Sequence, residues 1–460
     1  MGFLTGIRDI LIGVFGLGIM IFVHELGHLI AAKLLRVKVE KFSIGYGKKL
    51  FGFTRGGTTY QIALFPFGGF TKMKGEHVFA RAVQENLDRL PDDPDNYYHQ
   101  APWKRVIIAL AGPVFNILFA ILFFTVIYWV GFNEYSYGNR IILTSDLAAR
   151  PPAEQNPADA AGIKTGDRII AVNGRETRHF GEIRRELAFS PGRPASVTVQ
   201  RENGAIEHLT VTPRLNRDSA SGVIGVTDYA DPVVESVSPK TAELNSWLIP
   251  GVRITAVDGR PVKSNYDVLA AFKNKPESLP MTVERDGKAI TRDFHPPYID
   301  GDFQPLGIGF AVQPFRTPRY NIAQAFVRGL DEFSLNAYSI IYFFSLLPQR
   351  INVGNVIGGP LQTTVTIVQY TASGLDRGLD QGLVQFIQLL CMLSTILALM
   401  NLLPLPVLDG GFIILFIIEW LRRKPFRPRF IFRFQMVGVG LLGLLFIVVL
   451  FNDIFRLFSP

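Results

Sequence analysis

The sequence is poor in cysteine and in charge. It has one cysteine, Cys391, which lies in an apolar run, so no disulfide framework exists. Charged residues form 19% of the chain against 48% hydrophobic residues, and they are nearly absent from long blocks at both ends. The net charge of +8 does not indicate nucleic-acid binding, because Lys and Arg cluster beside the apolar blocks and orient a protein in a membrane. The lipid bilayer is therefore the expected partner, and nucleic acid is not.

Four apolar blocks span, or nearly span, a hydrocarbon core of about 30 Å. Three are uninterrupted, at 10–32, 106–132 and 436–451. The fourth, at 386–420, is too long for one straight helix and contains prolines and paired glycines, so we expect a broken span. The first block lacks a small-residue cleavage site, which argues against a removed signal peptide.

Basic flanks predict the orientation of these spans. Residues 33–105 contain thirteen Lys or Arg, and residues 422–433 contain six. The positive-inside rule places both segments on the cytoplasmic side. Both termini and the middle region, about 133–385, then face outward.

The first predicted cytoplasmic loop contains strand-like sequence. Residues 42–73 are rich in aromatic and β-branched residues and are broken by glycines, which predicts short strands. Two interpretations stay open: a small soluble hairpin domain, or strands that dip toward the membrane and line protein or a wet cavity. Residues 77–101 are polar, and we expect an exposed loop there.

The middle region contains an internal repeat at a fixed offset of 85 residues. Residues 162–175 align with 247–260, and each copy has a tight turn, an alternating strand and an Asn-Gly or Asp-Gly turn. This pattern resembles a tandem pair of PDZ domains. Such domains bind an extended peptide by strand addition, but a structural cap without a ligand is the open alternative. Val252 stands in the second copy where the first has Asp167, which argues against a shared ligand.

The first apolar block contains the sequence His-Glu-Leu-Gly-His at 24–28. Residues four apart share a helix face, so His24 and His28 reach one ion with Glu25 beside them. Inserting polar groups in a spanning segment costs a few kcal/mol, so we expect these residues to have a structural or functional role. The structural alternative is a buried His/Glu network that joins helices. With a rise of about 1.5 Å per residue, the site is submerged in the cytoplasmic half of the membrane.

A catalytic zinc has three protein ligands and an open fourth position. Among the acidic residues of the apolar blocks, Glu419 has an ordinary interfacial position next to Trp420. Asp409 lies among apolar residues in the segment 401–411, where an unpaired carboxylate is costly. We therefore expect Asp409 as the third ligand, with a helix-capping role as the alternative.

This set of residues predicts hydrolysis. Zinc lowers the pKa of a bound water to about 7, and Glu25 accepts the proton before passing it to the leaving amine. Asn116 and Asn401 each fit two roles, which are hydrogen bonding between helices and binding of substrate backbone or an oxyanion.

Taken in order, these motifs resemble the site-2 protease family of intramembrane zinc metalloproteases, of the bacterial regulator of sigma-E protease type. The resemblance rests on HELGH, GGF at 68–70, AGPVFN at 111–116, the PDZ-like pair and NLLPLPVLDGG at 401–411. It implies that His24, His28 and Asp409 bind zinc (Zn2+) and that Glu25 is catalytic. It also implies substrate-binding, oxyanion or channel-shaping roles for Asn116, Asn401, Pro404, Pro406, Gly68 and Gly69.

The resemblance further implies the reaction and the partners. Such a protein cleaves the transmembrane segment of a membrane protein with a single spanning helix, after another protease has trimmed its outer domain. Substrates of this kind are anti-sigma factors and remnant signal peptides. The PDZ-like pair would filter substrates by size, and the hairpin would pair with the unwound substrate strand. The implied location is the bacterial inner membrane, with the active site toward the cytoplasm and the PDZ-like domains outside.

The predicted fold is a polytopic α-helical membrane protein of about four spanning helices, with a membrane-associated β-hairpin region and two α+β PDZ-like domains inserted between helices two and three. The expected segments are 1–35 (first span), 36–102 (cytoplasmic loop with hairpin), 103–132 (second span), 133–230 and 231–318 (PDZ-like domains), 319–385 (outer linker with an interfacial helix), 386–421 (third, broken span), 422–434 (basic loop) and 435–456 (fourth span).

Two other functions fit part of the sequence. The first is a non-proteolytic, metal-binding membrane scaffold that recruits partners through its PDZ-like domains. Glu25 argues against it, because ligation alone needs only the two histidines and Asp409. The second is a zinc transporter, which would need ligands at several depths, whereas the apolar blocks show one cluster.

Overall fold

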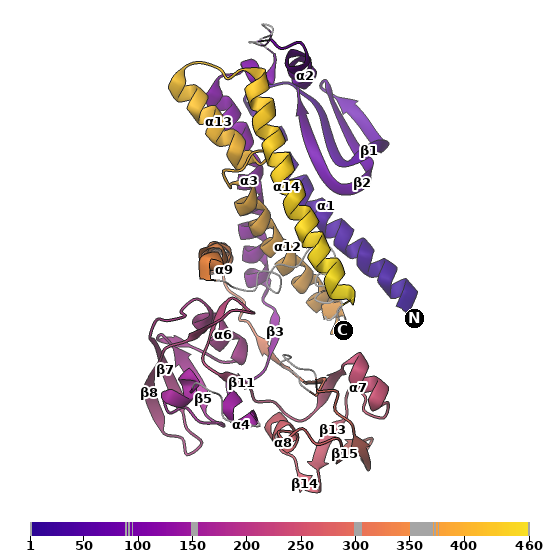
Figure 1. Ribbon diagram of the computed structural model, residues 1–460, viewed down its shortest axis with the longest axis vertical. Helices are drawn as coiled ribbons and strands as arrows, with labels where there is room; N and C mark the ends of the chain where they lie inside the picture. Colours follow the sequence, from indigo (N-terminus) through magenta and orange to yellow (C-terminus); the bar gives the residue numbers. More distant parts are fainter. Residues whose placement is uncertain are drawn as a thin grey trace. The chain divides into compact units, whose positions relative to one another are not determined.

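The computed structural model describes residues 2–458 except for 88–89, 91–92, 94, 149–154, 299–305, 350–370, 372–373 and 376. The chain forms two compact units (Figure 1). The helical unit is built from residues 1–132, 318–345 and 353–460, and the sheet unit from 133–317 and 346–352.

Four helices of the described chain are long and apolar enough to cross a membrane. They are α1 (Gly2–Leu34), α3 (Pro102–Val130), α12 (Leu379–Asn401) and α14 (Pro428–Phe458). Many of their large apolar side chains are exposed, among them Leu118, Leu122 and Leu444, as expected for helices that face lipid. α14 begins at Pro428, within the segment that we expected to be a basic loop, because proline fits the first turn of a helix.

The apolar block at 386–420 is interrupted between α12 and α13 (Asp409–Arg422). The interruption contains Pro404 and Pro406, which cannot donate backbone hydrogen bonds. The glycines that follow let the broken segment fold tightly onto the start of α13. A Cβ atom at Gly410 would lie 2.3 Å from the Leu403 oxygen, and one at Gly411 would lie 2.2 Å from the Leu405 oxygen.

The hairpin consists of β1 (Val39–Arg55) and β2 (Thr58–Met73), which are longer than the short strands predicted. Phe42 of β1 pairs with both Tyr60 and Thr71 of β2, and Tyr60 also pairs with Phe53. The two strands therefore fold back on themselves into a sheet four segments wide. Its outer segment, around Gly69, lies against α1, where a Cβ atom at Gly69 would be 2.8 Å from Ile21.

The segment 77–101 is not a continuous exposed loop as predicted. It begins within α2 (Glu76–Gln84) and contains a short 3-10 helix, η1 (Tyr97–His99). Phe79 and the two tyrosines of η1 pack in one apolar cluster with Leu415 and Phe416 of α13. The prediction was wrong because it followed the polar composition of the segment, although its few apolar residues are sufficient to bury one face of it.

The helix α9 (Ile322–Leu346) is a single continuous element, and Figure 1 shows it end-on beside α3. It is not among the candidate spans of the described chain. Glu332 accepts a hydrogen bond from the Tyr128 hydroxyl at 3.2 Å, and Gly329 lies against Thr125 of α3. The helix therefore packs on the bundle.

The sheet unit contains two four-stranded sheets with the same strand order, β6-β5-β7-β8 and β14-β13-β15-β16. The strands and helices of the first are β5 (Arg168–Val172), β6 (Arg175–Glu176), α6 (Phe180–Ala188), β7 (Ala195–Gln200) and β8 (Ile206–Val211). Those of the second are β13 (Arg253–Val257), β14 (Arg260–Pro261), α8 (Asn265–Ala271), β15 (Leu279–Arg285) and β16 (Lys288–Phe294).

Corresponding residues of the two sheets adopt the same local structure. β5 and β13 each have a register shift after their second residue, at Ile169 and at Ile254. The turns that follow also match, because Asn173 and Asp258 both have φ 50° and each precedes a glycine with positive φ. The two copies of the aligned sequence thus occupy equivalent positions.

Shorter pairs complete the sheet unit: β3 (Asn133–Ser136) with β18 (Gln313–Arg316), β4 (Ile141–Leu143) with β11 (Val226–Asp228), β9 (Arg214–Asn216) with β10 (Ser221–Val223), and β12 (Val234–Val237) with β17 (Ile308–Phe310). Its short helices are α4 (Thr144–Leu147), α5 (Pro157–Ala160) and α7 (Pro239–Leu244). Each half has its own apolar core, and Tyr137 packs against both.

A buried ion pair joins α3 to α13. Arg105 and Glu419 lie 2.5 Å apart, with side chains 4% and 2% exposed. The second Glu419 oxygen accepts a hydrogen bond from the Phe426 backbone at 2.7 Å. Glu419 therefore does not have the ordinary interfacial position that we expected. Its partner is 314 residues away in the sequence, where no local pattern reveals it.

Replacement of Glu419 by alanine should destabilise the helical unit, because Arg105 would keep a buried charge without a partner. We expect a loss of about 3–5 kcal/mol in the free energy of unfolding, measured by unfolding of the purified chain in detergent. Glu85→Ala, which removes the exposed pair with Arg81, is the control and should change little. Equal effects of both substitutions would contradict the importance of the buried pair.

Candidate metal centre

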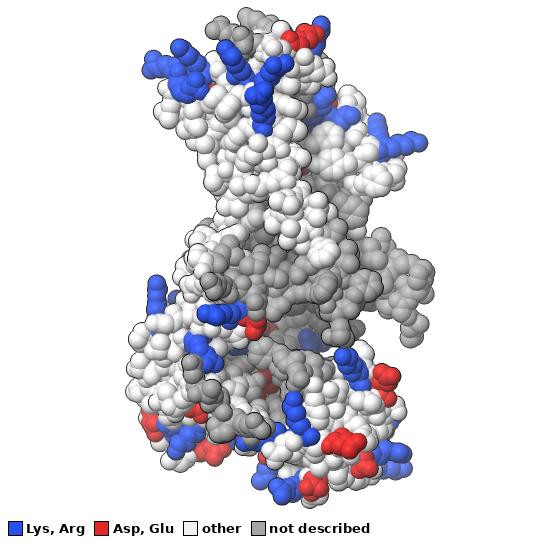
Figure 2. Space-filling model, viewed as in Figure 1, with Lys and Arg blue, Asp and Glu red and all other residues white. Residues whose placement is uncertain are grey.

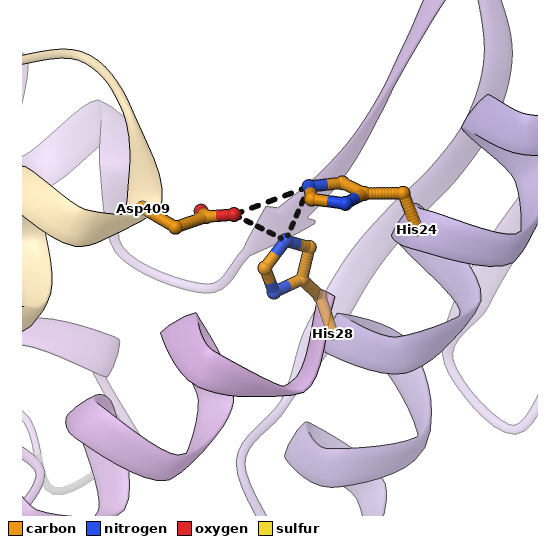
Figure 3. Close-up of side chains that lie close together, drawn as sticks. All are labelled: His24, His28 and Asp409. Carbon is orange, nitrogen blue, oxygen red and sulfur yellow. Dashed lines mark hydrogen bonds and ion pairs between the residues drawn. The ribbon is translucent and has the colours of Figure 1, made fainter. Parts of the chain in front are cut away.

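Three side chains from two helices converge on one point inside the helical unit (Figure 3). His24 and His28 come from successive turns of α1, and Asp409 is the first residue of α13. The Asp409 Oδ2 atom lies 3.1 Å from His24 Nε2 and 3.6 Å from His28 Nε2. The two Nε2 atoms are 3.3 Å apart. The sequence-predicted ligands are thus brought together.

This arrangement fits a zinc ion. Ligand atoms held at about 2.0–2.1 Å around a tetrahedral zinc lie about 3.4 Å from one another, close to the three distances found. Asp409 Oδ2 is buried and accepts no hydrogen bond from the described residues. Asp409 also does not cap α13, because the N-cap position belongs to Leu408 and has no side-chain cap. The capping alternative for Asp409 is therefore unsupported. Two imidazoles and one carboxylate leave a fourth position open, as in catalytic zinc sites.

The helix α3 contacts both imidazoles. His28 Nδ1 donates a hydrogen bond to the Ile108 carbonyl oxygen at 2.7 Å, and Asn116 Nδ2 lies 3.1 Å from His24 Nδ1. Between them is Gly112, where a Cβ atom would be 2.4 Å from His28 Nε2. Glycine is thus required at this position for the imidazoles to fit.

The hairpin contacts the Glu25 side chain. The Thr71 hydroxyl donates to Glu25 Oε2 at 2.8 Å and also lies 3.1 Å from the Glu25 backbone oxygen. The backbone of Gly69 approaches closely, since a Cβ atom there would lie 3.2 Å from Glu25 Cγ. A β-strand therefore runs beside the carboxylate that the sequence predicts as general base.

A cavity opens onto these groups. Several predicted site residues line it, namely His24, Glu25, His28, Gly68, Gly69, Asn401 and Asp409. Asn116, Pro404 and Pro406 are not among the lining residues. Three tyrosines, Tyr46, Tyr97 and Tyr98, also line the cavity. Sequence reasoning missed them, because no motif spacing connects the hairpin and the 3-10 helix to the metal ligands.

Tyr46 makes the most specific of these missed contacts. Its hydroxyl donates to the Gly69 carbonyl oxygen at 3.1 Å, and its ring stacks on Phe70. The sequence holds one signal for this position, because the glycine pair at 68–69 leaves space for a ring. A Cβ atom at Gly68 would lie 2.1 Å from Tyr46.

Four candidate spanning helices and a His-His-Asp cluster with an open fourth position are features of a membrane-bound metal-dependent hydrolase. Residues 12–445 match the family described as Peptidase family M50, so the chain belongs to this family and is a zinc metalloprotease. It is a membrane protein with four candidate spanning helices and sheet-rich regions.

Curated relatives match along nearly their whole length. A protein of Treponema pallidum named "Putative zinc metalloprotease" is 30% identical, over 98% of this chain and 99% of its own length. The Escherichia coli protein named "Regulator of sigma-E protease RseP" is also 30% identical, over 99% of this chain and 100% of its own. A zinc metalloprotease-named protein of Neisseria meningitidis is 29% identical, over 96% of this chain and 98% of its own.

Gly112→Ala should impair the metal centre without changing any polar group. The added methyl group would lie 2.4 Å from His28 Nε2 and 2.8 Å from His24 Cε1, so the imidazoles must move. We expect zinc affinity to fall roughly tenfold to hundredfold, in line with the cost of overpacking, as measured by chelator competition. The control is Gly18→Ala on α1, where an added Cβ atom meets nothing within 4 Å. Unchanged affinity in Gly112→Ala would contradict the assigned geometry.

Proposed function

We propose that this metalloprotease is an endopeptidase that hydrolyses a peptide bond within the transmembrane segment of a membrane protein. The observation that carries the proposal is the position of the site within or next to the candidate spanning helices. His24 and His28 lie within the candidate span 12–34, and Asp409 follows closely after the candidate span 379–401. A bond cleaved there must come from a segment that is itself in the membrane.

Each site residue has a role in this proposal. His24, His28 and Asp409 would hold zinc, which when bound polarises a water molecule and the substrate carbonyl. Glu25 would accept the proton of the attacking water and deliver it to the leaving amine. The hydrogen bond from Thr71 occupies Oε2 of Glu25 and so orients the carboxylate. Asn401 lines the cavity and is placed to bind substrate backbone.

The hairpin would present the substrate as an added strand. The outer segment of its sheet carries Gly69 and Thr71 beside Glu25, so a strand added next to that segment would pass the general base. A spanning helix must unwind to pair in this way. The contact between β2 and Glu25 supports this functional interpretation of the hairpin over that of a separate soluble domain.

The sheet unit would inspect the substrate before cleavage. We assign its two repeats as PDZ-like domains outside the cytoplasm that filter substrates by size. The name of the Escherichia coli relative supports an anti-sigma-factor-like substrate with a single spanning helix, pre-trimmed by another protease. Remnant signal peptides are a second substrate class with the same topology.

The distribution of basic residues supports an orientation in the bacterial inner membrane. Figure 2 shows Lys and Arg gathered at the end of the helical unit where α13 and α14 meet, beside a largely uncharged surface. Arg422, Arg423 and Lys424 are exposed where α13 ends and the chain leads to α14. By the positive-inside rule, this end of the helical unit would face the cytoplasm, and the metal centre would lie toward the same side.

Glu25→Gln tests the function directly. We expect the variant to bind zinc like the wild type, because the ligands are unchanged, and to lose about 10²–10⁴-fold in cleavage rate. Zinc content and the cleavage of a co-expressed single-span substrate are the two measurements. Glu40→Gln, which changes a hairpin glutamate paired with Lys72, is the control.

Two results would contradict the proposal. Wild-type cleavage by Glu25→Gln would show that Glu25 is not the general base. Mapping the wild-type product by mass spectrometry to a bond outside the substrate's apolar segment would overturn the assignment of intramembrane cleavage.

A further inference from the structure

Three positions of α3 face the two imidazoles at matched spacing. Ile108, Gly112 and Asn116 lie four residues apart and so share one helix face. His24 and His28 have the same spacing on α1. Ile108 contacts His28, and Asn116 contacts His24, so the two helices run in opposite directions through the contact. α3 thus offers one hydrogen-bonding group to each imidazole.

The chemistry of metal binding decides what each group must do. A neutral imidazole that binds a metal through Nε2 carries its hydrogen on Nδ1, which needs an acceptor. His28 has one, because a carbonyl oxygen can only accept, and the Ile108 oxygen is 2.7 Å from His28 Nδ1. For His24 the neighbouring group is the Asn116 amide, which can either donate or accept.

The Asn116 amide is positioned for this choice. It is fully buried, with Nδ2 3.1 Å from His24 Nδ1, and its Oδ1 has no hydrogen-bond partner in the described part of the chain. With Nδ2 as donor, His24 would carry its hydrogen on Nε2, which faces Asp409 and the metal position. Turning the amide over places Oδ1 against Nδ1 and frees the Nε2 lone pair.

We propose that Asn116 is a positioning residue that acts through His24: its Oδ1 accepts the Nδ1 hydrogen and directs the Nε2 lone pair at the metal. The inference rests on the proposed role of His24 as a ligand. It extends to the side chain of Asn116 what the Ile108 carbonyl does for His28. In either amide orientation one amide atom lacks a partner among the described residues, so the contact with His24 decides the orientation.

The other roles considered for Asn116 fit the contacts less well. Its link to α12 uses the backbone, because the Ser394 hydroxyl donates to the Asn116 carbonyl oxygen at 3.0 Å. The contact between α3 and α12 therefore does not need the side-chain amide of Asn116. An oxyanion-binding group must reach the cavity, and Asn116 does not line it, whereas Asn401 does.

Three substitutions in the full-length chain separate these roles. Asn116→Leu removes the acceptor, Asn116→Asp keeps an acceptor of the same shape, and Ser394→Ala removes the contact between α3 and α12 while leaving the amide. The readouts are zinc affinity by chelator competition and the visible absorption spectrum of the cobalt-substituted protein. Neither depends on proteolytic activity.

We expect Asn116→Leu to bind zinc about 10–100-fold more weakly, as for other groups that orient metal-binding histidines, and to shift the cobalt spectrum. Asn116→Asp should stay close to the wild type in both readouts, and so should Ser394→Ala. Wild-type zinc affinity in Asn116→Leu would overturn the proposal. Equal losses in Asn116→Leu and Ser394→Ala would also overturn it, in favour of a role in joining helices.

The aspartate variant protects the test against a folding defect. If Asn116→Leu does not fold, Asn116→Asp decides, because a loss of zinc affinity as large as that of His24→Ala would show that an acceptor at this position is not enough. Failure of the proposed function is a separate result. It would appear as wild-type cleavage by Glu25→Gln, whatever Asn116→Leu does to zinc binding.

Discussion

Polar groups inside a membrane must find partners within the protein, and this constraint organises the helical unit. Each imidazole has a hydrogen-bonding group on α3, and Asp409 faces both imidazoles. At the centre, Asp409 Oδ2 is buried and accepts no hydrogen bond from the described residues. Unsatisfied polar atoms in such a place cost several kcal/mol unless a metal binds them. The cluster therefore fits a bound cation.

Small residues make this arrangement possible. α1 and α3 approach so closely that a Cβ atom at Gly27 would lie 2.3 Å from the Ala111 oxygen. Gly112 leaves the same kind of space for the imidazoles themselves. In lipid, where the hydrophobic effect does not drive helices together, such close contacts supply the packing energy. Gly27 and Gly112 therefore let the helices lie close enough for the proposed metal ligands to fit between them.

Sequence alone could predict the parts of this structure that depend on local pattern. HELGH places two imidazoles on one helix face, and the apolar surroundings of Asp409 indicate a carboxylate that needs a partner. The structure brings these three side chains together. The pairing of Arg105 with Glu419, the fold-back of the hairpin and the tyrosines of the cavity could not be predicted. Each depends on contacts between segments far apart in the chain, and no spacing rule records them.

Different elements hold the proposed metal ligands and the proposed general base. The imidazoles are fixed by α3, whereas the Glu25 carboxylate is fixed by Thr71 of the hairpin. A displacement of β2 would therefore disturb proton transfer while leaving the ligands in place. Because the same strand would accept the substrate, a bound substrate would also fix the position of Thr71. Strand addition and orientation of the proposed base would in this way be one event, which would couple hydrolysis to the presence of an unwound substrate.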